Sequence, residues 1–168
     1  MTPVTATGPT TAPPITAGTG DADALNSLLR GELAAVETYD QALSKFEGTQ
    51  NALTVKELQR IRGEHAAATE VLSTRVAALG GTPSEGAGVW GVFATAVTGV
   101  AKVMGPQTAL SALRRGEEHG IGIYETALAN DDMSVECKYL IRNDLLPRCK
   151  MHIDALDQLV QQLKLEGK

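Results

Sequence analysis

A stretch of twenty residues occurs twice in this chain, and the repetition limits the folds available to it. Residues 24–43 and residues 109–128 agree at nine positions without a gap, at an offset of 85 residues. Both copies carry Arg-Gly-Glu, a Tyr seven residues after the Glu, and leucines spaced at helical intervals. An internal match at this density predicts a helical unit that is used twice.

The repeated Glu and Tyr of each copy lie on one stripe of a helix, because seven residues make about two turns. The pairs are Glu32 with Tyr39 and Glu117 with Tyr124. If both stripes face inward, two carboxylates are buried, and a buried charge that has lost its partner costs about 3–5 kcal/mol. The sequence therefore predicts a positive partner, either a metal ion or a basic side chain, at the centre of the fold.

Composition favours close-packed helices over sheets. Aromatic residues make up only 4% of the chain, so a core must be built from Leu, Ala and Val. Residues 1–20 contain seven Thr, four Pro and no charged residue, which predicts a disordered tail and leaves residues 21–168 as one domain. The tail lacks the basic start and apolar run of a secretory signal.

The net charge and the two cysteines indicate which binding partners and which cellular compartment to expect. A formal net charge of -5 argues against nucleic acid or an anionic membrane as the main partner. Cys137 and Cys149 are twelve residues apart, about 18 Å along one helix, which is too far for a disulfide. Two reduced thiols predict a cytoplasmic protein, with an intermolecular bridge as the alternative.

Periodicity and turn signals predict four long helices, arranged as two antiparallel hairpins related by a pseudo-twofold axis. The first hairpin ends at residues 80–83, Gly-Gly-Thr-Pro, where a glycine can take a left-handed turn and a proline resists continuation. Pro147 lies inside the last helix and predicts a kink there. The expected helices span about residues 21–46, 51–79, 106–129 and 133–164.

Between the hairpins, residues 84–105 form an apolar connection. Residues 87–104 contain one charged residue, Lys102, and approach the lower length limit for a membrane span. Glycines, polar interruptions and the lack of basic flanks weigh against insertion. We expect a crossover with a short apolar helix anchored by Trp90 and Phe93. Such a crossover lets the third helix start at the same end as the first. We expect a homodimer that forms through this apolar crossover or through an outer helix face.

The two returning helices also correspond, at an offset of 87 residues, and superpose His65 on His152. The separation is 33 residues from Glu32 to His65 and 35 residues from Glu117 to His152. A hairpin with its Glu halfway along one arm and its His halfway along the other brings both to a similar depth. The bundle centre is thus predicted to receive two carboxylates and two imidazoles. Counting the rise along the second hairpin, however, leaves Glu117 and His152 about 10 Å apart in height, unless the turn or a kink at Pro147 absorbs the difference.

These features resemble the ferritin-like superfamily, and more narrowly an uncharacterised bacterial branch of rubrerythrin-related four-helix-bundle proteins, described as a domain of unknown function. The resemblance covers about residues 22–164 and rests on R-G-E-x(6)-Y twice, on L-G-G-x-P after the second helix, and on His65 and His152. It implies an all-α, ferritin-like antiparallel four-helix bundle with a long crossover between the second and third helices. No reaction or substrate is assigned to that branch, so the resemblance implies neither.

In the metal-oxidising members of the superfamily, each returning helix carries Glu-x-x-His, and those glutamates bridge two iron ions. Here Arg62 and Cys149 stand three residues before the two histidines. The resemblance therefore implies a degenerate centre that holds a single Fe, Mn or Zn ion and serves metal storage or protection from oxidative stress. The implied ligands are Glu32, His65, Glu117 and His152, surrounded by Tyr39, Tyr124, Arg62 and Cys149, with Cys149 as a candidate soft ligand.

A metal-free alternative stays open. Arg30, Arg62 or Arg115 could pair with the buried Glu32 and Glu117 inside a helical module that serves interaction or dimerisation. An arginine meets the need for a positive partner as well as a metal ion does.

Overall fold

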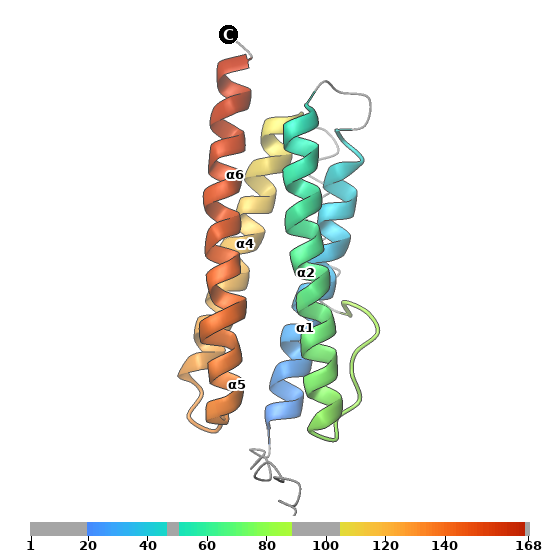
Figure 1. Cartoon of the computed structure of the whole chain (residues 1–168), viewed down its shortest axis with the longest axis vertical. Coiled ribbons are helices and arrows are strands. Elements are labelled where there is room, and N and C mark those ends of the chain that lie inside the picture. Colours follow the sequence, from blue (N-terminus) through green and yellow to red (C-terminus); the bar gives the residue numbers. More distant parts are fainter. Residues whose placement is uncertain (1–19, 47–50, 89–104, 167–168) are drawn as a thin grey trace, which may run out of the picture.

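The computed structural model describes residues 20–46, 51–88 and 105–166, so the predicted tail, apart from Gly20, lies outside the described residues. Within these ranges every regular element is helical (Figure 1). Three long helices and a segmented fourth lie side by side, which confirms the predicted all-α bundle. They are α1 (Asp21–Leu43), α2 (Ala52–Ala78), α4 (Pro106–Ala129), and the succession of α5 (Val135–Leu140), the π-helical turn η1 (Ile141–Leu145) and α6 (Leu146–Glu166).

The helices pack as two hairpins, α1 with α2 and α4 with α6, and the most extensive contacts lie within each hairpin. Figure 1 shows that α1 and α6 run toward one end of the bundle, whereas α2 and α4 run toward the other. The start of α4 therefore lies at the end where α1 stops, and the prediction that both helices start at the same end is wrong. The length of a connection does not reveal which end of the bundle it reaches.

Helix α2 ends just before Gly80 and Gly81, as the sequence predicts. Gly80 has a φ of +80°, the left-handed conformation that favours glycine. The N–H of Gly81 donates to the carbonyl of Val76 at 3.0 Å, and a Cβ on Gly81 would lie 3.0 Å from the Cβ of Ala22 at the start of α1. The missing side chain thus lets the chain pass close to α1.

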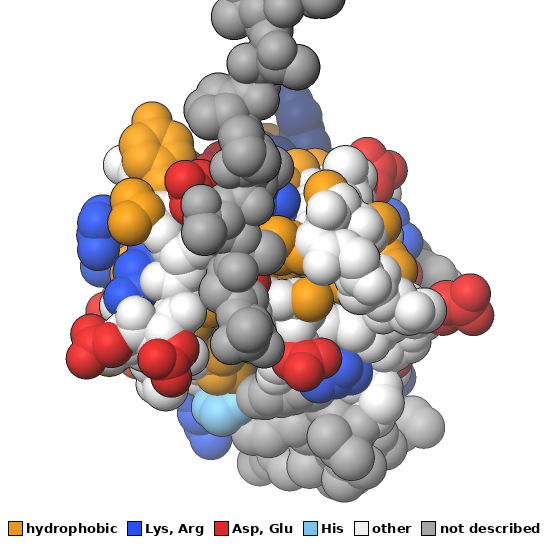
Figure 2. Space-filling model, turned by 90° about the horizontal axis from the view of Figure 1, so that it is seen from below, with side chains coloured by type: hydrophobic (Ala, Val, Ile, Leu, Met, Phe, Trp, Pro, Cys, Tyr) orange, Lys and Arg blue, Asp and Glu red, His pale blue; other side chains and the backbone are white. Residues whose placement is uncertain are grey.

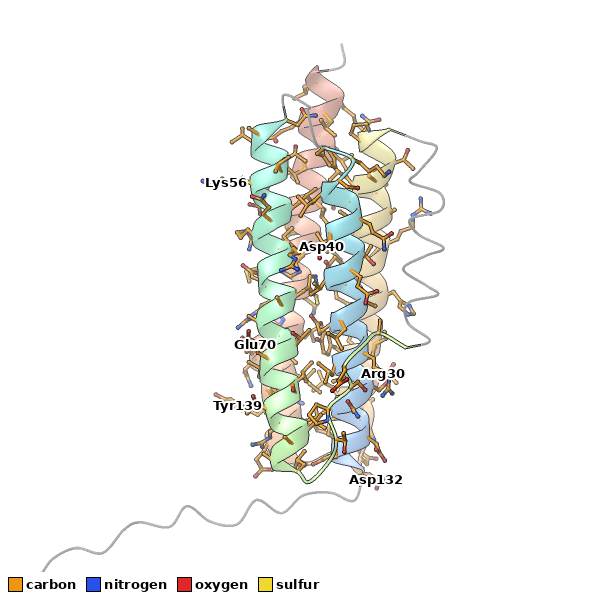
Figure 3. All side chains as sticks on the ribbon, turned by 90° about the vertical axis from the view of Figure 1, so that its right-hand side faces the viewer. Arg30, Asp40, Lys56, Glu70, Asp132 and Tyr139 are labelled. Carbon is orange, nitrogen blue, oxygen red and sulfur yellow. The ribbon has the colours of Figure 1, made fainter. Side chains whose placement is uncertain are left out.

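The residues after this turn run along α1. Asn26 accepts a hydrogen bond from the N–H of Ser84 at 2.8 Å, and Arg30 donates to the hydroxyl of Ser84 at 3.2 Å. Figure 3 shows Arg30 beside this part of the connection. The predicted apolar helix with Trp90 and Phe93, and the dimer contact placed on it, lie outside the described residues. Among the described helices, none combines the length and the apolar composition that a membrane-spanning segment requires.

The last helix contains a π turn where the sequence predicts a kink. Ser134 caps α5 by accepting a hydrogen bond from the N–H of Cys137 at 3.3 Å. The N–H of Leu146 bonds to the carbonyl of Ile141, five residues back, which is the π pattern. Pro147 follows at once and has no N–H with which to continue an α-helical ladder. The irregularity expected at Pro147 therefore takes the form of an inserted turn just before it.

Two apolar clusters fill the bundle, and a polar layer separates them. The lower core lies near the start of α1, and the upper core lies near the start of α4. The polar layer consists of Glu32, His65, Glu117 and His152, which are buried at the level between the two clusters. The lower core centres on Leu25, Leu72, Ile141 and Leu145, and the upper core on Phe46, Leu58, Leu110 and Leu156.

The outer surface carries charges of both signs. Figure 2 shows the lower end of the bundle, where acidic and basic side chains are interspersed around the rim. On the helix flanks, exposed ion pairs join Arg114 to Glu118 and Arg62 to Asp40.

Candidate metal centre

Four side chains from four helices meet in the polar layer. Glu32 comes from α1, His65 from α2, Glu117 from α4 and His152 from α6, and each is at most 6% exposed. The four residues that the sequence singles out therefore lie together inside the bundle.

His65 lies between the two glutamates. Its Nδ1 is 2.7 Å from Oε2 of Glu32, and its Nε2 is 2.9 Å from Oε1 of Glu117. Ionised carboxylate oxygens accept hydrogen bonds and cannot donate them, so His65 donates from both ring nitrogens. A single imidazole on α2 thus joins the carboxylates of α1 and α4.

The charges of this group follow from its contacts. Burial by itself would lower the pKa of His65, but Glu32 and Glu117 outweigh burial and raise that pKa to about 10. Burial would raise the pKa of Glu117, yet the charge of His65 and hydrogen bonds from His152 and His65 hold that pKa well below its ordinary value. At neutral pH an imidazolium therefore faces an ionised carboxylate in the polar layer.

Each buried tyrosine donates to the glutamate of the other repeat. The hydroxyl of Tyr39 donates to Oε1 of Glu117 at 2.6 Å, and the hydroxyl of Tyr124 donates to Oε1 of Glu32 through a short hydrogen bond. Burial is the main cause that raises the pKa of both tyrosines well above the ordinary range, and the charges of the neighbouring carboxylates raise it further. Both hydroxyls therefore keep their protons and act as permanent donors.

His152 lies between Glu117 and a residue that the sequence analysis missed. Its Nδ1 is 3.3 Å from Oε2 of Glu117, and its Nε2 is 2.8 Å from Oε2 of Glu64 on α2. Burial would raise the pKa of Glu64, but hydrogen bonds from His152 and Arg60 outweigh burial and lower it. The one sequence signal for the contact between Glu64 and His152 is that Glu64 is next to His65 on the same helix. Adjacent helical side chains point about 100° apart, so Glu64 faces a different neighbouring helix from the one that His65 faces.

Cys149 lies one turn before His152 and is 4% exposed. Burial, and then the charges of Glu117 and Glu32, raise the pKa of its thiol far above the ordinary value. The structure therefore places it against the polar layer as a protonated thiol, and both Cys137 and Cys149 are free.

The arginines lie outside the polar layer. Arg62 pairs with Asp40 of α1 on the outer surface, at 2.9 and 3.0 Å (Figure 3 labels Asp40). Arg30 donates to Ser84, and Arg115 is exposed. The predicted place of Arg62 around the centre is wrong. The alternative in which an arginine pairs with Glu32 or Glu117 in the core is not what the structure shows, because histidines and tyrosines make those contacts. Long arginine side chains reach water from the rim of a bundle, whereas histidine and tyrosine fit inside it.

Side-chain direction closes the gap in height that counting predicts between Glu117 and His152. The Cα–Cβ bond of a helical residue tilts toward the N-terminus of its helix. Because α4 and α6 are antiparallel, Glu117, nearer the turn, leans away from the turn, and His152, further from the turn, leans back toward it. The π turn takes up one extra residue over the same length. The two side chains therefore meet at 3.3 Å.

Three of these residues have the arrangement of a metal site. His65, Glu117 and His152 each offer a ligand atom, and the three atoms lie within 4.8 Å of one another. Two imidazole nitrogens with one carboxylate are the ligands of some catalytic zinc sites and of mononuclear Fe(II) sites. Glu32 instead faces Nδ1 of His65, where a carboxylate orients a ligand histidine. Together, His65, Glu117 and His152 could hold a metal ion.

A small cavity between α1 and α4 leads to the polar layer. Its volume is about 90 Å³, and its lining includes Gly31, Gly116 and Gly120 together with the glutamates and tyrosines described above. A Cβ on any of the three glycines would meet no described atom within 4 Å. The glycines therefore leave space beside the layer.

Residues 21–130, from the start of α1 to just past the end of α4, match the family described as "Domain of unknown function (DUF2383)". The chain belongs to this family. No match was found among curated proteins.

The fold of this DUF2383 protein has a counterpart among solved structures. It is similar to a crystal structure described as ferritin like, diiron-carboxylate proteins from Bacillus anthracis str. Ames, with a TM-score of 0.64 and 20% sequence identity. The similarity covers 83% of this chain and 94% of that chain. At this identity the similarity shows the fold alone, and it confirms that the DUF2383 chain is a ferritin-like helical bundle.

A two-ion centre does not fit this DUF2383 protein. Such a centre uses the glutamates of two Glu-x-x-His motifs as bridges between the ions. Here one of those positions is Arg62, which is bound to Asp40 at the surface, and the other is Cys149, a buried thiol. The described residues therefore lack the bridging carboxylates.

Proposed function

We propose that this ferritin-like bundle binds one divalent transition-metal ion through Nε2 of His65, Nδ1 of His152 and the carboxylate of Glu117. The observation that supports the proposal is the convergence of these three buried side chains, from three helices, within 4.8 Å. Each histidine directs its other nitrogen at a carboxylate, Glu32 or Glu64, which is how ligand histidines are oriented in metal sites.

The ligands suit Fe²⁺, Mn²⁺ or Zn²⁺. Glu32 and Glu117 supply negative charge, and His65 would give up the proton on Nε2 when an ion binds. Iron or manganese would supply one-electron redox chemistry, and zinc would supply Lewis-acid chemistry.

We propose a role in metal storage or in protection from oxidative stress. The support is the ferritin-like fold together with the description of the Bacillus anthracis protein as a diiron-carboxylate protein. We also propose a cytoplasmic location, because Cys137 and Cys149 are free and buried. We further propose that the protein belongs to the rubrerythrin-related bacterial branch of this superfamily. In this proposal a pseudo-twofold axis relates the two hairpins, and a long crossover joins α2 to α4.

Metal titration of the purified full chain tests the metal site. After chelator treatment, Fe²⁺ without oxygen, Mn²⁺ or Zn²⁺ should bind at about one equivalent and, at 100 times Kd, raise the free energy of unfolding by about 2.7 kcal/mol. His65→Gln and His152→Gln should remove both effects, whereas the exposed His119→Gln should retain them. Binding below about 0.1 equivalents, or full binding by His65→Gln, would contradict the proposal.

A metal-free helical module that forms a homodimer is the second candidate. One observation favours it, because no buried side-chain nitrogen or oxygen among the described residues lacks a hydrogen-bond partner. Val135 and Tyr139 on α5 are 78% and 68% exposed and offer apolar contact area. Failure to bind metal, together with a dimer in sedimentation that Tyr139→Glu dissociates, would select this candidate.

A further inference from the structure

An ion must cross the protein to reach the proposed ligands. His65, Glu117 and His152 are 4%, 4% and 1% exposed, so none of them can take an ion directly from solvent. The described part of the chain offers two approaches to them. One is the cavity between α1 and α4, and the other is Glu64, between α2 and α6.

Glu64 connects solvent with the polar layer through one carboxylate. Its Oε2 is 2.8 Å from Nε2 of the buried His152, while its own side chain is 30% exposed. A cavity of about 10 Å³ lies beside it, lined in part by His65 and Cys149, close to the smallest volume that holds one water. A carboxylate that spans this boundary is suited to passing a cation inward.

Arg60 occupies the outer oxygen of Glu64. Its guanidinium pairs with Oε1 of Glu64 and also with Oε1 of Glu57, at 2.7 Å in the second pair. Because the Arg60 side chain is 41% exposed, it can remain with Glu57 in water when a cation takes its place at Glu64. The pairing therefore compensates the charge of Glu64 without burying it.

The cavity between α1 and α4 is a poor route for a cation. Its walls are mostly apolar, with Leu28, Leu113 and Ile123 among them. Its two carboxylates, Glu32 and Glu117, are buried in the polar layer itself, so they offer an incoming ion no ligand before it arrives there. An ion that moves along apolar surface loses its hydration without gaining ligands, at a cost far above that of moving along a carboxylate. The cavity suits a small neutral molecule better.

We propose that Glu64 is the access residue of the metal centre, where a hydrated divalent cation first binds at the α2/α6 surface before it passes to His152 and Glu117. This inference rests on the proposed function. Glu64 is outside the final ligand set, so loss of its charge should slow both arrival and departure of the ion. The equilibrium affinity should change less than either rate.

Stopped-flow binding of Co²⁺ to the full chain, followed by visible absorption, tests the proposal. Glu64→Gln keeps an oxygen that can accept from His152 but removes the charge, and association should slow by about tenfold. The matched control is Glu70→Gln, which removes the charge of an exposed side chain six residues further along the same helix. A second control, Gly120→Leu, fills the cavity between α1 and α4. Both controls should associate at the wild-type rate.

Equal association rates for Glu64→Gln and Glu70→Gln would overturn the access role, and so would slower association in Gly120→Leu than in Glu64→Gln. Faster dissociation of Co²⁺ from Glu64→Gln with unchanged association would also overturn it, because that result means that Glu64 only orients His152. If the wild-type protein binds no Co²⁺, both the proposed function and this inference, which rests on it, are wrong. In the other cases the metal site stands and only the route is wrong.

Discussion

The hydroxyl of Tyr39 on α1 donates to Oε1 of Glu117 on α4, 78 residues further along the chain, at 2.6 Å. The equivalent residues of the other repeat make the reciprocal bond, from Tyr124 to Glu32. Each copy of the repeat thus supplies the acceptor for the other copy's donor. The two hairpins are joined at the level of the polar layer by these exchanged hydrogen bonds.

Removal of either hydroxyl should destabilise the protein. Tyr39→Phe leaves Glu117, and Tyr124→Phe leaves Glu32, without one buried donor, and a hydrogen bond to a charged group contributes about 1.5–3 kcal/mol. We expect losses of this size in the free energy of unfolding, measured by denaturant titration. The double variant should depart from additivity, because both bonds belong to one network through His65.

Tyr139→Phe is the matched control for these variants. Its side chain is 68% exposed and points outward on α5 (Figure 3), so its loss should change stability by less than about 0.5 kcal/mol. A loss from Tyr39→Phe as small as that of the control would show that the hydroxyl does not support Glu117.

The stability of the protein without added metal should fall on both sides of a plateau in pH. His65 has a pKa of about 10 in the folded protein and 6.5 when unfolded. Its contribution is therefore complete below about pH 6.5 and is lost as the pH rises toward 10, by up to about 1.4 kcal/mol per pH unit. Glu117 has a lowered pKa, so its contribution is present above its unfolded value of 4.5 and is lost as the pH falls below that.

Denaturant titrations at intervals between pH 4 and pH 9 measure this profile. In His65→Gln the decline above pH 6.5 should disappear, because no imidazolium remains between the two glutamates. An unchanged alkaline decline in that variant would assign the effect to another group.

Metal affinity should rise with pH. An ion at Nε2 of His65 must displace a proton held there with a pKa of about 10, so each binding event below that pH releases at least one proton. The apparent association constant should therefore increase at least about tenfold per pH unit between pH 6 and pH 9. Calorimetric titrations with Zn²⁺ in two buffers of different ionisation enthalpy would count the protons, and a count of zero would exclude His65 as a ligand.

Cys149 should behave as an inert thiol. Burial and the nearby glutamates raise its pKa, so iodoacetamide should modify it only after unfolding, as mass spectrometry of treated protein would show. Cys149→Ser should still bind one equivalent of Co²⁺, without loss of an absorption band. A near-ultraviolet thiolate band in the wild-type complex that is absent from Cys149→Ser would instead make Cys149 a ligand.

The repeat and its periodicity were enough to predict the helices, the glycine turn at Gly80, and the inward direction of Glu32, Glu117 and both histidines. These features depend on which residues share a helix face, and spacing along the chain determines that. The homodimer, the crossover helix and the cytoplasmic location stay predictions, and residues 89–104, which hold most of the crossover, lie outside the described residues.

Only the tertiary structure decided which neighbour each of these side chains meets. Glu64 and Arg62 both lie within one turn of His65, yet Glu64 reaches His152 whereas Arg62 turns out to Asp40. Glu32 faces Nδ1 of His65, the ring nitrogen on the side away from Glu117. The candidate ligands are therefore His65, Glu117 and His152, three residues where the sequence implied four. Periodicity along one helix shows in which direction each side chain points around the axis of that helix. The partner in that direction depends on how the helices are ordered and whether they run parallel, which the packing of the whole bundle sets.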